Sequence, residues 1–176
     1  IPRGMGLGGS AVIAVCIIKA LNKYFEMGLS EQEINQMAFE SEKIAHGNPS
    51  GIDNTIATYG YPLIYRKSEN TLQEKLQINK PFDLVLAFSK SEGLTAKTVA
   101  DVKERWVNNQ EMYEDIFNDI DAIALKGIQA IQNNDLKQLG ELMNFNQGLL
   151  NTLQVSTPEL ERMIHLARDA GAYGAK

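Results

Sequence analysis

Cysteine, long apolar runs and an excess of basic residues are all missing from this 176-residue sequence. The single cysteine, Cys16, cannot form an internal disulfide, and its apolar neighbours predict a buried thiol in a reducing, cytoplasmic setting. The longest apolar run, residues 11–18, is too short to span a bilayer, so we expect no membrane partner. Because the 17 basic residues are outnumbered by 22 acidic ones and the sequence has no basic stripe, we expect no nucleic-acid partner either.

The composition is that of an ordinary globular protein, with 44% hydrophobic and 22% charged residues. The length allows one large domain or two small ones, and the polar residues 67–81 are the best candidate for a boundary. Strand-like segments lie in the middle of the sequence, with helical patterns before and after them. This order predicts an α+β fold. We expect the sequence to be a piece of a longer protein.

Two helices are predicted near the start. The first follows a glycine-rich loop and runs to about Glu26, with a broad, largely buried apolar face: Val12, Ile13, Cys16, Ile17, Ala20 and Leu21. The second begins at a capping box formed by Ser30 and Glu33 and ends before Gly47. Its predicted apolar face consists of Ile34, Met37, Ala38 and Ile44.

Several short segments are predicted as strands. Thr55–Tyr59 and Leu63–Tyr65 are rich in β-formers and indicate a hairpin. Leu76–Ile78 is a weaker candidate, and Phe82–Phe88 has the pattern of a buried strand.

From Thr95 onward the periodicity predicts four helices. We expect Asn134 to cap the third of them. Thr157, followed by Pro158, is predicted to cap the fourth.

A glycine-rich segment, residues 4–10, indicates a phosphate-binding loop. The glycine spacing matches the dinucleotide-binding fingerprint, but that motif also needs a preceding strand and a following acidic residue, and the sequence shows neither. The Lys-Ser/Thr pair of the nucleotide-triphosphate P-loop is also absent. Glycines let backbone N–H groups converge, and the N-terminus of the next helix favours an anion. Ser10 would be in reach of a phosphate or a Mg²⁺ ion. A tight entry into a packed helix explains the glycines equally well.

A second segment, Glu42–Asp53, places a carboxylate on each side of a polar turn. Taken singly, Glu42 is typical of a solvated helix face, His46 of a helix-end cap and Asp53 of a closed turn. Together, and behind a phosphate-type loop, two such carboxylates can serve a metal ion and a proton transfer. The combination favours phosphoryl transfer.

The same segments carry a family resemblance. Residues 1–11 resemble the second signature of the GHMP kinase superfamily, and Glu42–Asp53 resembles its mevalonate kinase branch. Residues 53–60 and 91–95 continue the resemblance weakly, and residues 171–176 are similar to the lead-in of the third signature.

The resemblance implies a ribosomal S5 domain 2-like N-terminal domain over residues 1–78 and a ferredoxin-like, helix-rich C-terminal domain over residues 79–176. It implies an ATP- and Mg²⁺-dependent kinase that phosphorylates the primary hydroxyl of mevalonate in isoprenoid precursor synthesis. Asp53 would be the catalytic residue, and Ser10 and Glu42 would be the metal ligands. His46, Ser50 and Thr95 would contact substrate, and the nucleotide would be held by Gly4, Gly6, Leu7, Gly8, Gly9, Ser10 and Ala11.

This sequence also departs from the family pattern. Gly9 replaces the first serine of the loop, and both the family's N-terminal lysine and its third signature are absent from these residues. Three alternatives therefore stay open: a non-catalytic nucleotide- or metabolite-binding relative, a sibling kinase with another hydroxylated substrate, and a helical interaction module over residues 95–170. A homodimer is a further expectation.

Overall fold

The structure is a computed structural model that describes residues 6–47, 49–67, 72–89 and 95–176, without the side chains of Leu72, Thr95 and Ala96. The chain divides into two compact units, Ile1–Gln77 and Ile78–Lys176. The first unit contains α1 (Gly9–Tyr24), α2 (Glu31–His46), α3 (Ile52–Tyr59), β1 (Leu63–Arg66) and β2 (Leu72–Lys75). The second contains α4 (Thr95–Asn108), α5 (Gln110–Asn133), α6 (Leu136–Thr152) and α7 (Pro158–Asp169). This helix-rich arrangement with a small sheet confirms the α+β class.

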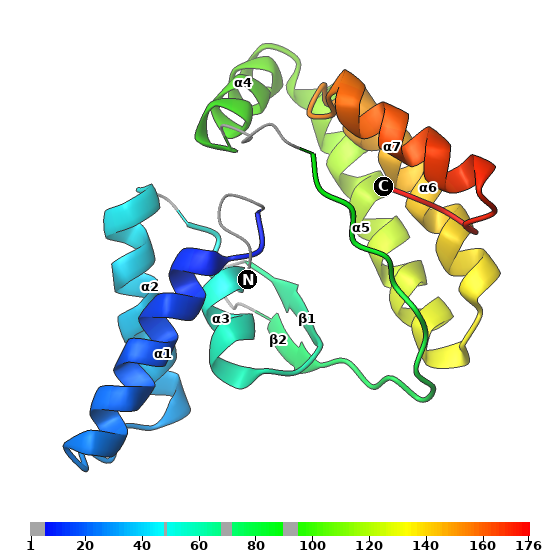
Figure 1. Cartoon of the computed structure of the whole chain (residues 1–176). Helices are drawn as coiled ribbons and strands as arrows, with labels where there is room; N and C mark the ends of the chain where they lie inside the picture. The colour runs from blue at the N-terminus through cyan, green and yellow to red at the C-terminus, as the bar shows by residue number, and fades with distance from the viewer. Residues whose placement is uncertain (1–5, 48, 68–71, 90–94) are drawn as a thin grey trace. The chain divides into compact units, whose positions relative to one another are not determined.

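In the first unit, α1, α2 and α3 pack against one another, with the β1–β2 hairpin following α3 (Figure 1). Val15, Ile34 and Ala38 form the buried centre of the three helices. Leu29 packs onto this cluster, and the predicted capping box is confirmed, because Ser30 and Glu33 exchange both hydrogen bonds. The capping box fixes where α2 begins and therefore where Glu42 and His46 fall on it.

The predicted apolar faces of α1 and α2 are wrong in part. In α1 the buried residues are Ala11 and Val15, whereas Ile13, Ile17, Leu21 and Cys16 are exposed. The helix is apolar around most of its circumference, and α2 and α3 cover only one side of it. In α2 the buried stripe is Ile34, Ala38 and Glu42, and Met37 and Ile44 are exposed.

The predicted hairpin is wrong in its first strand. Residues 55–59 belong to α3, and β1 pairs instead with β2 in antiparallel register, Leu63 opposite Lys75. The two threonines are accommodated in the helix because their hydroxyls bond to backbone carbonyls one turn earlier. Thr55 Oγ1 donates to Gly51 O at 2.6 Å, and Thr58 Oγ1 donates to Asn54 O at 2.7 Å.

Two other strand predictions are also wrong. Residues 76–78 are outside the hairpin, whose second strand ends at Lys75. Phe82–Phe88 forms no strand and is largely exposed, with Val85 93% accessible. An apolar run forms a buried strand only where a neighbouring strand supplies hydrogen bonds, and no described residue pairs with this one.

The second unit is built on α5 and α6, which lie side by side, with α4 packed on α5 and α7 joined to α6 (Figure 1). Its core centres on Tyr113, Ile116 and Leu153. Thr157 caps α7 with Pro158 in its first turn, as predicted. The cap of α6 is Asp135 rather than Asn134, because Asn134 ends α5 in the left-handed conformation. Among the described residues, no helix combines the length and apolar character needed to cross a membrane.

Candidate active site

The glycine-rich loop enters α1 through Gly8. Gly8 is the N-cap of α1 with φ 63°, and Gly6 also has a positive φ of 67°. Among the described residues, no side chain caps this end of the helix, so the first-turn N–H groups keep their affinity for an anion. Ala11 is fully buried and anchors the loop to the core, whereas Leu7 is partly exposed. Gly4 lies outside the described residues.

Gly8 lies directly against Asp53. A Cβ atom on Gly8 would be only 3.2 Å from Cβ, Cγ and Oδ1 of Asp53. Asp53 is in the first turn of α3 and is exposed, while the next two residues of the helix, Asn54 and Thr55, are buried. The loop backbone and an accessible carboxylate are therefore neighbours, although 45 positions separate them in the sequence.

Ser10, His46 and Glu42 form a second contact chain. His46 Nε2 lies 3.1 Å from Ser10 Oγ and 3.8 Å from Glu42 Oε2. Both contacts use the same ring nitrogen, so the arrangement is no Ser-His-acid triad, in which the acid bonds to the other nitrogen. Its geometry brings a hydroxyl and a carboxylate to one place, with an exposed imidazole between them.

Glu42 is only 4% exposed, which rules out the solvated helix face considered from the sequence. It lies in the apolar stripe of α2, near the C-terminal end of the helix, where the helix dipole disfavours a negative charge. A buried carboxylate needs a compensating charge or hydrogen bonds. Among the described residues, its ion-pair partner is His46, whose Nε2 lies 3.8 Å from Glu42 Oε2. The position suits a carboxylate whose partner is a bound cation.

The turn between Glu42 and Asp53 is held by β1 and the residue that follows it. Tyr65 Oη donates to Ser50 O at 2.8 Å, and Lys67 Nζ donates to Pro49 O at 3.2 Å. Burial raises the pKa of the Tyr65 hydroxyl, so it remains a protonated donor at neutral pH. Gly51 has φ 91°, and a Cβ there would come 2.8 Å from Tyr65 Oη. Any other residue at position 51 would therefore strain the backbone and displace either the turn or the Tyr65 side chain.

Tyr65, Lys67 and Asn35 are the residues near this site that the sequence patterns did not single out. Asn35 offers the clearest signal, because an amide next to Ile34 and seven residues before Glu42 lies close to the buried stripe of α2. Thr95 begins α4 in the second unit, and its side chain is not described. The structure thus gathers Gly8, Asp53, Ser10, His46 and Glu42 in the first unit.

Two family models match the chain. The model of the GHMP kinases N terminal domain matches residues 1–61, and that of the GHMP kinases C terminal matches residues 128–176. The first match contains the glycine loop and the Glu42–Asp53 segment. The chain belongs to the GHMP kinase family.

Within that family the chain is similar to mevalonate kinases. It is 36% identical to the mevalonate kinase of Pyrococcus abyssi, covering 100% of this chain and 53% of the relative. It is 37% identical to that of Methanothermobacter thermautotrophicus, covering 100% of this chain and 57% of the relative. The chain therefore spans about half the length of the curated relatives it matches.

Solved structures agree with this similarity. The crystal structure of L. major mevalonate kinase in complex with R-mevalonate matches 98% of this chain and 53% of its own, with a TM-score of 0.83 and 31% identity. The Methanococcus jannaschii mevalonate kinase matches 100% of this chain and 54% of its own, with a TM-score of 0.71 and 28% identity. Because these matches cover nearly the whole chain, both units have the fold of the family.

Proposed function

We propose that this chain is part of a mevalonate kinase that transfers the γ-phosphoryl group of ATP to the primary hydroxyl of mevalonate. The observation that carries the proposal is the juxtaposition of the glycine loop and an exposed carboxylate, with Gly8 against Asp53. Curated relatives named mevalonate kinase support the substrate, as does the L. major enzyme, whose structure holds R-mevalonate.

The nucleotide phosphates are proposed to bind at the start of α1. Backbone N–H groups of Gly6, Leu7, Gly8, Gly9, Ser10 and Ala11 would surround them, with Gly4 as a further member of the loop. Two observations support this assignment: Gly6 and Gly8 have positive φ angles, and no side chain in the described part of the chain caps α1. The helix dipole adds electrostatic attraction for the phosphate charge.

Ser10 and Glu42 are the proposed ligands of Mg²⁺. A hydroxyl and a carboxylate are the oxygen donors that this ion prefers, and two protein ligands suffice where phosphates and waters complete the shell. Residues of the described part of the chain form no cluster of three His, Cys, Asp or Glu side chains for a metal. The donors nevertheless fit, because both oxygens contact the same exposed His46 side chain. When bound, the ion would neutralise charge on the phosphate oxygens.

Asp53 is proposed to receive the proton of the mevalonate hydroxyl, or to orient that hydroxyl. As the hydroxyl oxygen bonds to the γ-phosphorus, the bond to the bridging oxygen breaks, ADP leaves, and the proton passes to the carboxylate. The exposure of Asp53 leaves it accessible to a substrate. His46, Ser50 and Thr95 are the proposed substrate contacts.

We also expect a cytoplasmic location and a homodimer, without nucleic-acid or membrane partners.

The test is a phosphorylation assay on the full-length protein with Mg²⁺–ATP and a panel of hydroxylated acceptors. We expect ADP formation with mevalonate and a phosphorylated mevalonate product detected by ³¹P NMR. Turnover only with another acceptor would make the protein a sibling kinase. Nucleotide binding without any turnover would contradict the proposal and favour a non-catalytic relative.

A further inference from the structure

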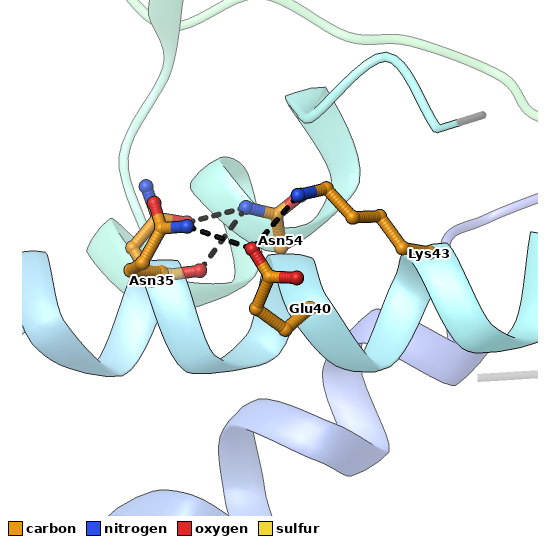
Figure 2. Close-up of polar contacts among 5 residues, drawn as sticks. Asn35, Glu40, Lys43 and Asn54 are labelled. Carbon is orange, nitrogen blue, oxygen red and sulfur yellow. Dashed lines mark hydrogen bonds and ion pairs between the residues drawn. The ribbon is translucent and has the colours of Figure 1, made fainter. Parts of the chain in front are cut away.

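A hydrogen bond between two side-chain amides, the buried Asn54 and the partly buried Asn35, joins α2 to α3 beside the candidate site. Asn54 Nδ2 donates to Asn35 Oδ1 at 2.6 Å, and it also lies 3.4 Å from Asn35 O (Figure 2). Asn35 Nδ2 in turn donates to Thr55 Oγ1 at 3.4 Å. Asn54 is 2% exposed and Thr55 is 3% exposed, whereas Asn35 is partly buried, so these contacts are partly shielded from water.

The network holds the first turn of α3 on both sides of Asp53. Thr55 Oγ1 donates a hydrogen bond to Gly51 O at 2.6 Å, so Asn35 is linked, directly or through Thr55, to positions 51, 54 and 55. At 3.6 residues per turn these positions share one face of the helix. Asp53 lies outside that buried face and is exposed. A rotation of α3 about its axis would therefore carry the Asp53 carboxylate away from Gly8.

The surrounding apolar contacts are poorly suited to prevent such a rotation. The apolar cluster between α2 and α3 contains Ile34, Ala38 and Ala57, and the hydrophobic effect that drives its burial is non-directional. Hydrogen bonds, by contrast, are directional and short-ranged. The hydrogen bond from Lys19 Nζ to Thr58 O, at 2.6 Å, holds only the other end of α3.

The amide pair also carries a cost that argues against a purely stabilising role. Asn54 Oδ1 is buried without a hydrogen-bond partner among the described residues, and an unsatisfied buried acceptor destabilises the fold. Buried polar groups of this kind can fix a unique packing rather than add stability. Here the amide pair would fix the orientation of α3 about its own axis.

We propose that Asn35 is a positioning residue for phosphoryl transfer: through Asn54 and Thr55 it sets the rotation of α3 and thereby holds the Asp53 carboxylate against the phosphate loop. The inference rests on the proposed function. Asn35 touches neither substrate nor phosphate in this role. Its effect should therefore appear in kcat, because a misplaced group disturbs the reacting geometry.

The first experiment compares Asn35→Ala with Asn22→Ala in the full-length enzyme. Asn22 is a matched control, because it is a partly buried asparagine of the same unit whose side chain makes two hydrogen bonds, to Leu29 O and N. We expect Asn35→Ala to lower kcat by about 10- to 100-fold with the KM for ATP changed by less than about twofold. Asn22→Ala should lower Tm similarly and keep kcat. Equal kcat values for Asn35→Ala and the parent enzyme would overturn the inference.

A second variant keeps the test independent of folding. Thr55→Val preserves the β-branched shape but removes both hydroxyl contacts, so it should fold and lower kcat in the same direction by a smaller factor. Full kcat in a folded Thr55→Val enzyme would contradict the proposed link between Asn35 and the start of α3.

A third measurement separates this inference from the proposed function. If Asn35 acts through Asp53, Asn35→Ala should cause no further loss of rate in an Asp53→Asn background, since coupled residues are non-additive. A full multiplicative loss there would overturn the positioning role. An Asp53→Asn enzyme with normal mevalonate turnover would instead overturn the proposed function itself.

Discussion

Single residues decide how closely the parts of this site approach. Gly8 combines a left-handed φ of 63° with the contact to Asp53, so it meets two requirements that a side chain would violate. The sequence indicates that glycines are needed in this loop, because a run of glycines before a helix is typical of anion binding. It does not indicate which glycine faces Asp53, since that depends on how α3 packs against α1.

Gly8→Ala should impair both folding and catalysis. We expect about 1–2 kcal/mol of backbone strain from the left-handed conformation. The new methyl group would also push Asp53 out of place, which should lower kcat by about 10- to 100-fold. Steady-state kinetics and thermal unfolding of the full-length enzyme measure the two effects.

Gly28→Ala is the matched control for that substitution. Gly28 has a similar φ of 70°, but a Cβ there would meet no atom of the described residues within 4 Å. The control should show the strain in Tm and keep kcat. If both variants lost kcat equally, the contact between Gly8 and Asp53 would have no catalytic importance.

Glu42 shows what residue patterns can and cannot predict. The spacing Ile34, Ala38, Glu42 is visible in the sequence and puts all three on one helical stripe. A glutamate at the edge of such a stripe is usually solvated, so burial could not be deduced from α2 alone. The buried position follows from the packing of α2 against α1 and α3.

At the scale of elements, α3 and β1 set the geometry of the turn between the two carboxylates. The start of α2 was predictable because a capping box is a local signal. α3 was not, because Thr55, Ile56 and Thr58 favour a strand by propensity. In the helix the hydroxyls of Thr55 and Thr58 bond to Gly51 O and Asn54 O, and the segment packs against elements that only the folded unit provides.

Tyr65→Phe tests whether the hydrogen bond from β1 stabilises this turn. Loss of the hydrogen bond to Ser50 O should reduce the free energy of unfolding by about 1 kcal/mol. It should also lower kcat/KM for mevalonate, because Ser50 is a proposed substrate contact. Chemical denaturation and steady-state kinetics report the two effects.

Tyr61→Phe serves as the comparison. The Tyr61 hydroxyl makes no hydrogen bond to the described residues, and its ring contacts with Tyr59 and Lys75 survive the change to phenylalanine. This variant should behave like the parent enzyme. Equal losses in both variants would show that β1 does not support the turn through Tyr65.

At the scale of the whole molecule, two units with separate cores share one chain. The hydrophobic pattern predicts burial for Ile13, Ile17 and the run Phe82–Phe88, yet the two isoleucines are exposed and the run is largely exposed. Burial depends on what packs against a side chain, and no described element of this chain covers these residues. The family and its α+β class were predictable because their signatures are local, whereas these contacts are not.

In the proposed function, the phosphate loop and Asp53 form one phosphoryl-transfer site. Asp53→Asn in the full-length enzyme tests it most directly, since the change keeps the size of the side chain and removes its negative charge. Single-turnover kinetics with mevalonate should show a loss of about 100-fold or more, while the affinity for Mg²⁺–ATP, measured by calorimetry, stays within about twofold because uniform binding is retained. A normal rate of phosphoryl transfer in this variant would contradict the account.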